Sequence, residues 1–255
     1  MTRIIACVSG KGGAGKTTLV ANLGIALAKM GKDVTVLDAN LTTPNLGLHL
    51  GVPLSPVTIH DVLKGKANIA QAIYRHESGL KIIPAGIALK DLKGVDARDL
   101  STAILDLLGN TEIVLIDAAA GLGREALAAV EAADEMLLIT NPDLPAVTDA
   151  LKSAKLAEQL GTNVTGIVIN RKSGRRHEMA REEILSMLDG YQFLGEISED
   201  EEVKNALSKR IPVVHHKPDA TASREIKRVA ARLIGIELPE EKPKLSKRFL
   251  GFFRR

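Results

Sequence analysis

The chain has 255 residues, of which 45% are hydrophobic and 25% charged, and its formal net charge is +3. A chain of this length buries a substantial core within one α/β domain. The small net charge does not by itself indicate a nucleic-acid binder. The single cysteine, Cys7, excludes an intrachain disulfide and a Cys-x-x-Cys cluster site. Because we find neither a secretory signal pattern nor an apolar run long enough to span a bilayer, we expect a cytoplasmic protein.

Short apolar runs alternate with helical ones along the chain. The expected strands are Ile4–Val8, Val34–Leu37, Leu80–Pro84, Ile113–Ile116, Met136–Thr140 and Val164–Ile169. The expected helices are Thr17–Met30, Ile59–Leu63, Asp99–Leu108, Arg124–Ala133, Val147–Leu160 and His177–Leu188. This order predicts an α/β fold with a mostly parallel, doubly wound sheet covered on both faces. A ligand then belongs at the carboxyl edge of the strands, where the loop after Val8 lies.

That loop is rich in glycine and joins the first expected strand to the first expected helix. It consists of Gly10, Lys11, Gly12, Gly13, Ala14, Gly15, Lys16, Thr17 and Thr18, a complete phosphate-binding loop. Glycines let backbone N–H groups converge on phosphate oxygens, and the helix N-terminus adds a favourable dipole. The pattern predicts that Lys16 binds the β- and γ-phosphates of ATP, Thr17 binds Mg²⁺ and Thr18 donates to the α-phosphate.

A carboxylate follows the apolar run Ile113–Ile116. Asp117 lies where the expected strand ends, and there it would orient Mg²⁺ through water. An acidic residue in this position can also be only a helix cap, which is the alternative interpretation. Together with the glycine-rich loop, Asp117 predicts a P-loop NTPase that binds ATP with Mg²⁺.

Lys11 is one lysine more than the binding of phosphate in cis requires. It follows the first glycine and projects away from its own loop, so a solvated loop lysine is the simplest alternative. The loop resembles the deviant Walker A motif of the ParA/MinD superfamily of dimerising ATPases. The resemblance implies an ATP-dependent homodimer in which Lys11 reaches the partner's nucleotide and acts in catalysis, as an arginine finger does.

Three further stretches are similar to the MinD branch of this superfamily, especially its archaeal members. They are Asn45–Leu48, Thr58–Leu63 with Gly65, and Thr140–Asp143. The resemblance covers nearly the whole chain. It implies an ATPase for spatial positioning, of the cell-division site or of other cargo, with an unidentified protein activator or cargo as a partner.

Two loops resemble the nucleotide-sensing switches of the family, and both depart from its pattern. Switch I usually reads Asp-x-Asp, whereas this sequence has Asp38, Ala39 and Asn40. Asp38 is expected to serve the metal through water. Asn40 replaces the aspartate that helps to place the attacking water, and it accepts no proton, so we expect slow hydrolysis. Switch II reads Ala118 to Gly121 without the usual proline, and Gly121 is expected to rearrange with the γ-phosphate.

The adenine end of the site is expected after the last parallel strand. Ile167–Arg171 resembles a strand-end asparagine stretch of the family, in which Asn170 offers a donor and an acceptor to the adenine edge and Arg171 lies beside it. The alternative is that Asn170 only turns the chain. Glu196–Asp200 resembles a second stretch beside the base, but Ser198 replaces its proline, so that contact is not carried over.

The end of the chain is amphipathic. Residues 239–243 form a charged, proline-containing linker, and residues 244–255 hold three of the four phenylalanines and five basic residues. On a helix the cations occupy one arc, and the opposite arc consists of Leu245, Phe249, Leu250, Phe252 and Phe253. This segregation resembles the membrane-targeting sequence of the MinD branch and predicts an interfacial helix on an anionic membrane. The alternative is a terminal helix docked on its own domain.

These features predict an ATPase domain over residues 1–238, a linker over 239–243 and a membrane-targeting helix over 244–255, which places the protein at the inner face of the cell membrane. Two other functions are considered. The basic residues between 171 and 176 keep open a ParA-type DNA-partition ATPase, although the tail favours a membrane over nucleic acid. Asn40 keeps open a non-hydrolysing, ATP-gated membrane scaffold.

Overall fold

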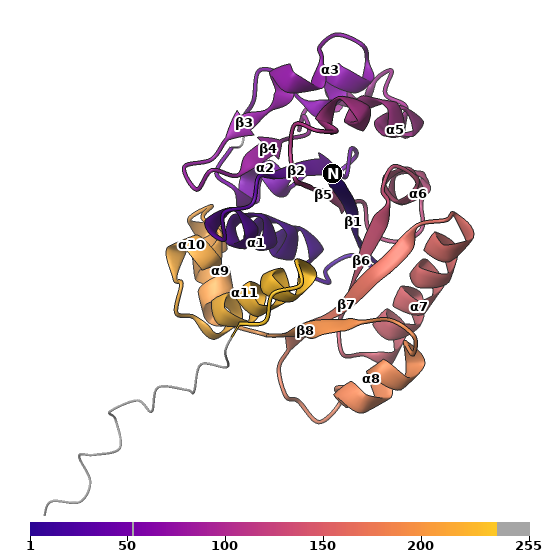
Figure 1. Cartoon of the computed structure of the whole chain (residues 1–255), viewed down its shortest axis with the longest axis vertical. Helices are drawn as coiled ribbons and strands as arrows, with labels where there is room; N and C mark the ends of the chain where they lie inside the picture. Colours follow the sequence, from indigo (N-terminus) through magenta and orange to yellow (C-terminus); the bar gives the residue numbers. More distant parts are fainter. Residues whose placement is uncertain (53, 239–255) are drawn as a thin grey trace, which may run out of the picture.

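The computed structural model describes residues 1–52 and 54–238. An eight-stranded sheet runs through them in the order β3-β4-β2-β5-β1-β6-β7-β8, and every pairing is parallel except that of β3 with β4 (Figure 1). The strands are β1 (Arg3–Ser9), β2 (Val34–Ala39), β3 (Tyr74–Arg75), β4 (Lys81–Ile83), β5 (Ile113–Ala118), β6 (Glu135–Thr140), β7 (Asn163–Lys172) and β8 (Phe193–Ser198). The predicted α/β fold with a mostly parallel sheet is confirmed.

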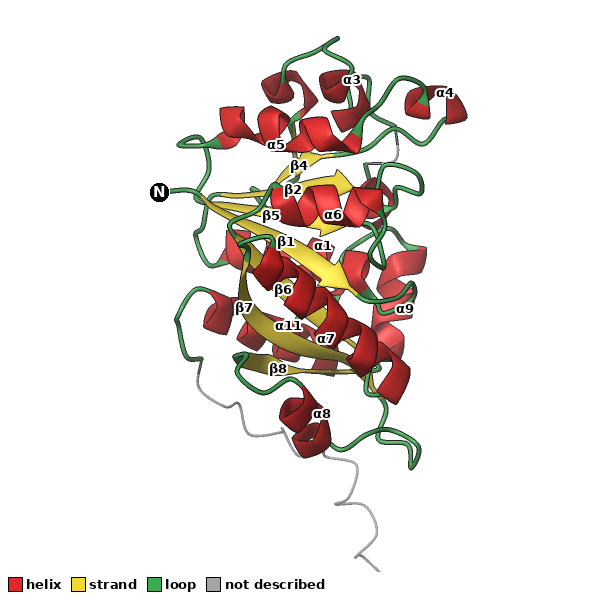
Figure 2. Cartoon of the chain, turned by 90° about the vertical axis from the view of Figure 1, so that its right-hand side faces the viewer, coloured by secondary structure: helices red, strands yellow, loops and turns green. Residues whose placement is uncertain are grey.

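Helices cover both faces of the sheet (Figures 1 and 2). One face carries α1 (Lys16–Lys29), α2 (Leu46–His49), α9 (Glu201–Ser208), α10 (Val213–His216) and α11 (Thr221–Leu233). The other carries α3 (Ile59–Leu63), α5 (Leu100–Ala103), α6 (Arg124–Glu131), α7 (Leu144–Gln159) and α8 (Arg181–Met187). The connections include α4 (Leu89–Leu92) and 3₁₀ turns at Ile69–Ala72, Ala97–Asp99 and Ile104–Leu107. Two hydrophobic cores result, one on each side of the sheet.

The central strands are apolar because both of their faces are covered. Every residue of β2 and β5 is buried, which is typical of parallel strands between two layers of helices. The two charged residues in these strands, Asp38 and Asp117, are both buried and both near the carboxyl end. A charge at such a position needs a partner, so it marks this edge of the sheet as a site.

The register of the strands brings these two carboxylates together. Asp38 of β2 lies opposite Asp117 of β5, and on the other side Cys7 of β1 lies opposite Asp117. Parallel strands end at one edge of a sheet, so the loops that follow β1, β2, β5, β6 and β7 meet there. The glycine-rich loop follows β1 and therefore lies at the same edge.

The helix expected over 177–188 begins only at Arg181. Glu178 lies in the preceding turn, because its carboxylate accepts hydrogen bonds from the backbone amides of Ser173 and Gly174, each at 2.8 Å. These bonds satisfy the backbone of a loop, where a helix would have required other partners. The predicted start of this helix was therefore wrong by four residues.

Several elements have no counterpart among the expected ones: the strands β3 and β8 and the helices α2, α4, α9, α10 and α11. β3 has only two residues, and the apolar pattern of β8 is interrupted by a glycine and a glutamate. α11 has a strongly charged outer face, yet it buries Ile226, Val229 and Leu233 beside α1. The helix expected over 99–108 is also divided, because α5 is flanked by 3₁₀ turns. Packing against neighbouring elements, which a local pattern does not contain, determines these segments.

No described helix is long and apolar enough to cross a membrane. The predicted linker over 239–243 and the predicted helix over 244–255 lie outside the described residues. The same holds for the predicted membrane face of Leu245, Phe249, Leu250, Phe252 and Phe253. The domain boundary at residue 238 therefore stays a prediction.

Candidate functional site

The glycine-rich loop between β1 and α1 has a backbone that requires glycine. Gly13 and Gly15 both have a φ of +82°, a conformation that residues with a Cβ rarely adopt. A Cβ on Gly15 would also lie 2.5 Å from the side-chain nitrogen of Asn170. A Cβ on Gly10 would collide with Asp149 of α7. The loop is therefore held between α7 and the end of β7.

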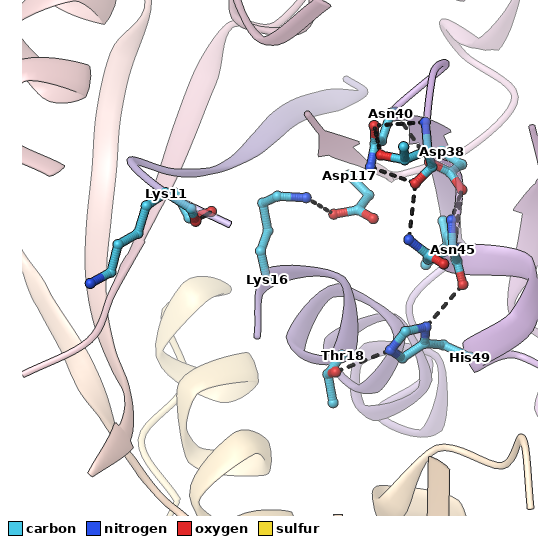
Figure 3. A network of polar contacts seen from close by, with 11 residues as sticks. Lys11, Lys16, Thr18, Asp38, Asn40, Asn45, His49 and Asp117 are labelled. Atoms are coloured by element: carbon cyan, nitrogen blue, oxygen red, sulfur yellow. Dashed lines mark hydrogen bonds and ion pairs between the residues drawn. The ribbon is translucent and has the colours of Figure 1, made fainter. Parts of the chain in front are cut away.

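Lys16 and Asp117 form a buried ion pair at the centre of the site (Figure 3). Lys16 Nζ donates to Asp117 Oδ1, and the two residues are 6% and 0% exposed. The second carboxylate oxygen, Asp117 Oδ2, is buried and has no hydrogen-bond partner. Removing one charge from a buried pair leaves the other uncompensated, which is costly. If phosphates draw Lys16 away, the carboxylate of Asp117 needs another positive charge. The site therefore favours a ligand that brings both phosphates and a cation.

Asp38 lies beside this pair and is itself fully buried. Its Oδ1 accepts a hydrogen bond from the backbone amide of Asn40 at 3.1 Å. Its Oδ2 accepts from the amides of Asn45 at 3.1 Å and Leu46 at 3.0 Å. Burial, followed by the negative charge of Asp117, raises the pKa of Asp38 to about 7. Two carboxylates in a dry site repel each other, and a divalent cation relieves this repulsion.

These oxygen donors fit a Mg²⁺ ion that keeps several water ligands. The described part of the chain contains no cluster of three or more His, Cys, Asp or Glu side chains that could hold a metal by themselves. The unpaired Asp117 Oδ2 is the free carboxylate oxygen of the site, and Thr17 lies half-buried in the first turn of α1. Mg²⁺ usually binds through one or two protein oxygens together with water and phosphate. Thr17, Asp38 and Asp117 would hold it, directly or through water.

Asn40 is engaged within its own loop. Its Nδ2 donates to the carbonyl of Thr43 at 2.7 Å, and its Oδ1 accepts from Thr43 Oγ1 at 3.0 Å. Figure 3 shows this amide above Asp38, at the edge of the network. The residue that replaces the family's second aspartate is thus held by Thr43 through both ends of its amide.

Lys11 extends away from Lys16 (Figure 3). Its Nζ forms an ion pair with Asp143 Oδ1 at 2.8 Å, in which the two side chains are 40% and 39% exposed. Asp143 also caps α7, because Oδ1 accepts from the amide of Ala146 at 3.0 Å. Asp143 was not predicted as a partner of Lys11. The sequence held one signal for Asp143. It is an acidic residue after an expected strand and two positions before a proline, which is typical of a helix N-cap.

Asn170 and Arg171 line a pocket of about 270 Å³ beside the loop. Asn170 Nδ2 donates to the carbonyl of Ala14 at 2.7 Å, and Arg171 Nη1 donates to that of Gly13 at 2.8 Å. Arg171 also pairs with Glu199 at 2.8 Å. The apolar walls of the pocket are Leu19, Ile197, Val203, Leu207 and Ile226. A pocket with apolar walls and a few polar groups suits a flat base, and the contact of Asn170 with adenine stays a prediction.

The two switches are joined to neighbouring elements. The amide of Gly121, whose φ is +80°, donates to the carbonyl of Ser9 at 3.0 Å. Thr42, two residues after Asn40, binds Glu125 at the start of α6 through both its amide, at 3.2 Å, and its hydroxyl. Switch I therefore contacts the helix that follows switch II.

Comparison with known proteins agrees with this geometry. The family described as the CobQ/CobB/MinD/ParA nucleotide binding domain matches residues 5–213. An uncharacterised ATP-binding protein of Methanocaldococcus jannaschii is 38% identical over 253 residues, which cover 99% of this chain and 96% of that protein. The septum site-determining protein MinD of Thermotoga maritima is 32% identical, with 94% and 91% covered. The structure of septum site-determining protein MinD from Pyrococcus horikoshii complexed with Mg-ADP has a TM-score of 0.88 at 35% identity and covers 91% of this chain and 96% of that chain.

The chain therefore belongs to the CobQ/CobB/MinD/ParA nucleotide-binding family. Within that family it is MinD-like, as the predicted resemblance implied. The P-loop NTPase fold and the use of ATP with Mg²⁺ are confirmed at the level of the family. The roles of the individual site residues stay predictions.

The buried ion pair leads to a test of the site. Lys16→Ala is expected to weaken Mg-ATP binding by about 100-fold or more, since charge-assisted bonds to phosphate are lost, as measured by isothermal titration calorimetry. The same change leaves Asp117 unpaired and should lower the free energy of unfolding by about 3–5 kcal/mol. The double variant Lys16→Ala/Asp117→Asn is the control. It should recover much of the thermal stability and still fail to bind, whereas normal binding by this variant would contradict the site.

Proposed function

We propose that this protein is an ATP-dependent, dimerising and membrane-associating ATPase that positions cellular cargo, such as the division site. The observation that carries the proposal is the different placement of the two loop lysines. Lys16 is buried against Asp117, whereas Lys11 lies at the surface and extends away from it. One loop thus offers a cation to its own nucleotide and a second cation to another molecule.

The other molecule, whose phosphates Lys11 binds, is a second copy of the chain. In a two-fold dimer the same patch of each protomer faces the other, so each Lys11 reaches the phosphates of its partner. Lys11 has to leave Asp143 first. A half-exposed ion pair contributes only about 0.2–1 kcal/mol, whereas a hydrogen bond to a charged phosphate contributes about 1.5–3 kcal/mol. ATP therefore favours the exchange of Asp143 for the partner's nucleotide.

The same side chains catalyse the hydrolysis of ATP at a low rate. Mg²⁺ supplies positive charge to the β- and γ-phosphates when it is bound. Lys16 and Lys11 bind phosphate oxygens, and Asp117 would help to hold the metal. Asn40 turns from Thr43 toward the attacking water and hydrogen-bonds it, but an amide does not take its proton. The ATP-bound dimer is therefore long-lived.

Membrane association is proposed from the amphipathic sequence of residues 244–255. Its five cations add at most about 1 kcal/mol each near an anionic surface, and ordering the segment opposes the gain from its apolar side chains. A single tail is thus a weak anchor. Two tails on one dimer raise the avidity by roughly 10²–10⁴, so ATP controls membrane residence through dimerisation. The MinD relatives reported above, which bear the name of septum site-determining proteins, support positioning as the purpose.

A DNA-partition ATPase is the second candidate, because of the basic residues between 171 and 176. Two of these cations already have acidic partners: Arg171 pairs with Glu199 at 2.8 Å and Lys172 with Glu196 at 3.3 Å. Cations that are neutralised within the protein release fewer counterions from DNA. This pairing supports the membrane function over the DNA function, and retention on DNA rather than on vesicles would reverse the choice.

The ion pair of Lys11 yields a prediction about dimerisation. Asp143→Asn keeps a helix cap but removes the charge that holds Lys11, so the ATP-bound dimer should tighten by about 2- to 30-fold, given one pair of about 0.2–1 kcal/mol in each protomer. Lys11→Ala should spare nucleotide binding by the monomer and block the dimer. Sedimentation velocity with Mg-ATP measures both, with Glu158→Gln on α7 as the control. A Lys11→Ala variant that dimerises normally would refute the proposed interface.

The position of Asn40 yields a prediction about rate. Asn40→Asp restores a proton acceptor and loses the bond to the Thr43 carbonyl, so it should accelerate phosphate release, by up to about 10²–10⁴-fold. The rate is measured at saturating Mg-ATP. Thr43→Val is the matched control, since it loosens the same turn without adding a carboxylate, and it should leave the rate within a few-fold. Equal rates for Asn40→Asp and the unmodified protein would show that position 40 is not limiting.

The tail yields a prediction about membranes. Deletion of residues 244–255 should abolish sedimentation with anionic vesicles in Mg-ATP while the protein still dimerises, and Phe252→Glu should do nearly the same because a charge enters the apolar arc. The full chain should sediment far less in Mg-ADP than in Mg-ATP. Equal sedimentation in the two nucleotides would contradict control by dimerisation, even if the tail proves to be the anchor.

A further inference from the structure

His49 connects the phosphate-binding loop with switch I, although no step described above uses it. It is the last residue of α2, which directly follows switch I. Its Nε2 lies 3.1 Å from Thr18 Oγ1, and its Nδ1 lies 2.9 Å from the carbonyl oxygen of Asn45 (Figure 3). The imidazole is therefore inserted between the last residue of the glycine-rich loop and the end of switch I.

The partners of the ring determine where its proton is. The Asn45 carbonyl can only accept a hydrogen bond, so Nδ1 of His49 carries the proton and donates. In the neutral ring Nε2 then has only a lone pair. The bond at 3.1 Å is consequently one in which the Thr18 hydroxyl donates its proton to His49 Nε2. Thr18 has a single hydroxyl proton, so this bond occupies its whole capacity to donate.

His49 is also linked to Asp38, the carboxylate of switch I, through Asn45. The backbone of Asn45 is held from two sides: its carbonyl accepts from His49, and its amide donates to Asp38 Oδ2 at 3.1 Å. The amide of Leu46 donates to the same oxygen at 3.0 Å. Thr18, His49, Asn45 and Asp38 thus form one continuous chain of hydrogen bonds.

We propose that His49 is a positioning residue that senses the α-phosphate and transmits its binding to switch I. A phosphate oxygen and His49 Nε2 compete for the one proton of Thr18. When Thr18 donates to the phosphate, His49 keeps its bond to the Asn45 carbonyl but loses its anchor on α1, so α2 and the turn at Asn45 are no longer tied to the phosphate-binding loop by this ring. The inference rests on the proposed contact between Thr18 and the α-phosphate, but it needs neither dimerisation nor the membrane.

Two substitutions of His49 separate the two ends of the ring. The nitrogen of an asparagine side chain takes the place of His49 Nδ1. His49→Asn therefore keeps the hydrogen bond to the Asn45 carbonyl and loses the hydrogen bond from the Thr18 hydroxyl. The amide oxygen of a glutamine side chain reaches the place of Nε2 and accepts the Thr18 proton. His49→Asn should therefore bind Mg-ADP about 2- to 10-fold more tightly than the unmodified chain, which is the gain from one competing hydrogen bond. His49→Gln should restore the original affinity to within a factor of two.

Mg-ADP is the probe because it has an α-phosphate and lacks the γ-phosphate on which the proposed dimer depends. Affinities are measured by isothermal titration calorimetry with the full chain. A double-mutant cycle with Thr18→Val completes the experiment. In the Thr18→Val background, His49→Asn should have no effect on affinity, whereas a general structural defect at α2 would appear in both backgrounds.

Nitrogen-15 NMR of the histidine side chains gives a readout that does not depend on affinity. His49 should show a neutral ring with its proton on Nδ1, and its Nε2 signal should shift on addition of Mg-ADP and be shifted already in Thr18→Val. A ring protonated on Nε2, or equal Mg-ADP affinities for His49→Asn and the unmodified chain, would overturn the proposal. If Mg-ADP does not bind the unmodified chain, the nucleotide site itself is wrong, which is a different failure.

Discussion

The buried ion pair of Lys16 with Asp117 is the interaction on which the rest of the site depends. Its partners come from α1 and β5, 101 residues apart, and they meet only because β1 and β5 pair in parallel. The same register places Asp38 next to Asp117, so one lysine faces two buried carboxylates. Such a site lacks positive charge. In the proposed function, a magnesium nucleotide would provide the missing cation and, in its phosphates, the anion that Lys16 would bind in place of Asp117.

Four side chains that are expected to contact the nucleotide or the attacking water have a partner within the protein. Lys16 is paired with Asp117, Lys11 with Asp143, Asn40 with Thr43 and Thr18 with His49. A buried or half-buried polar group without a partner is costly, so these contacts stabilise the loops. In the proposed function, nucleotide binding would exchange one set of contacts for another, which costs less than the ordering of a flexible loop.

The contacts between loops suggest how a change at the phosphates reaches the surface. Switch I is attached to α6 through Thr42 and Glu125, and α6 follows switch II. Beside this junction lies a cavity of about 800 Å³, lined by residues of switch I, α6 and the segment around Asp96. The groups that are expected to bind ATP and the outer surface of α6 thus belong to one packed unit.

The sequence by itself determined the parts that depend on short-range patterns. The run from Gly10 to Thr18 predicted a phosphate-binding loop between strand and helix, and Gly13 and Gly15 have positive φ values there that glycine reaches most easily. Alternating apolar runs predicted a mostly parallel sheet, since strands covered on both faces are apolar throughout. Asp117 was predicted as a site residue because a carboxylate follows such a run at the strand end.

Only the tertiary structure decided which residues become partners of these groups. Lys11 and Asp143 are 132 residues apart, and Thr18 and His49 are 31 residues apart, so no local spacing connects them. α11 was not expected, because its charged face hides the apolar residues that pack beside α1. A sequence records what each residue can donate, accept or bury. Which partner it meets depends on how the strands align and which loops come together at one edge of the sheet.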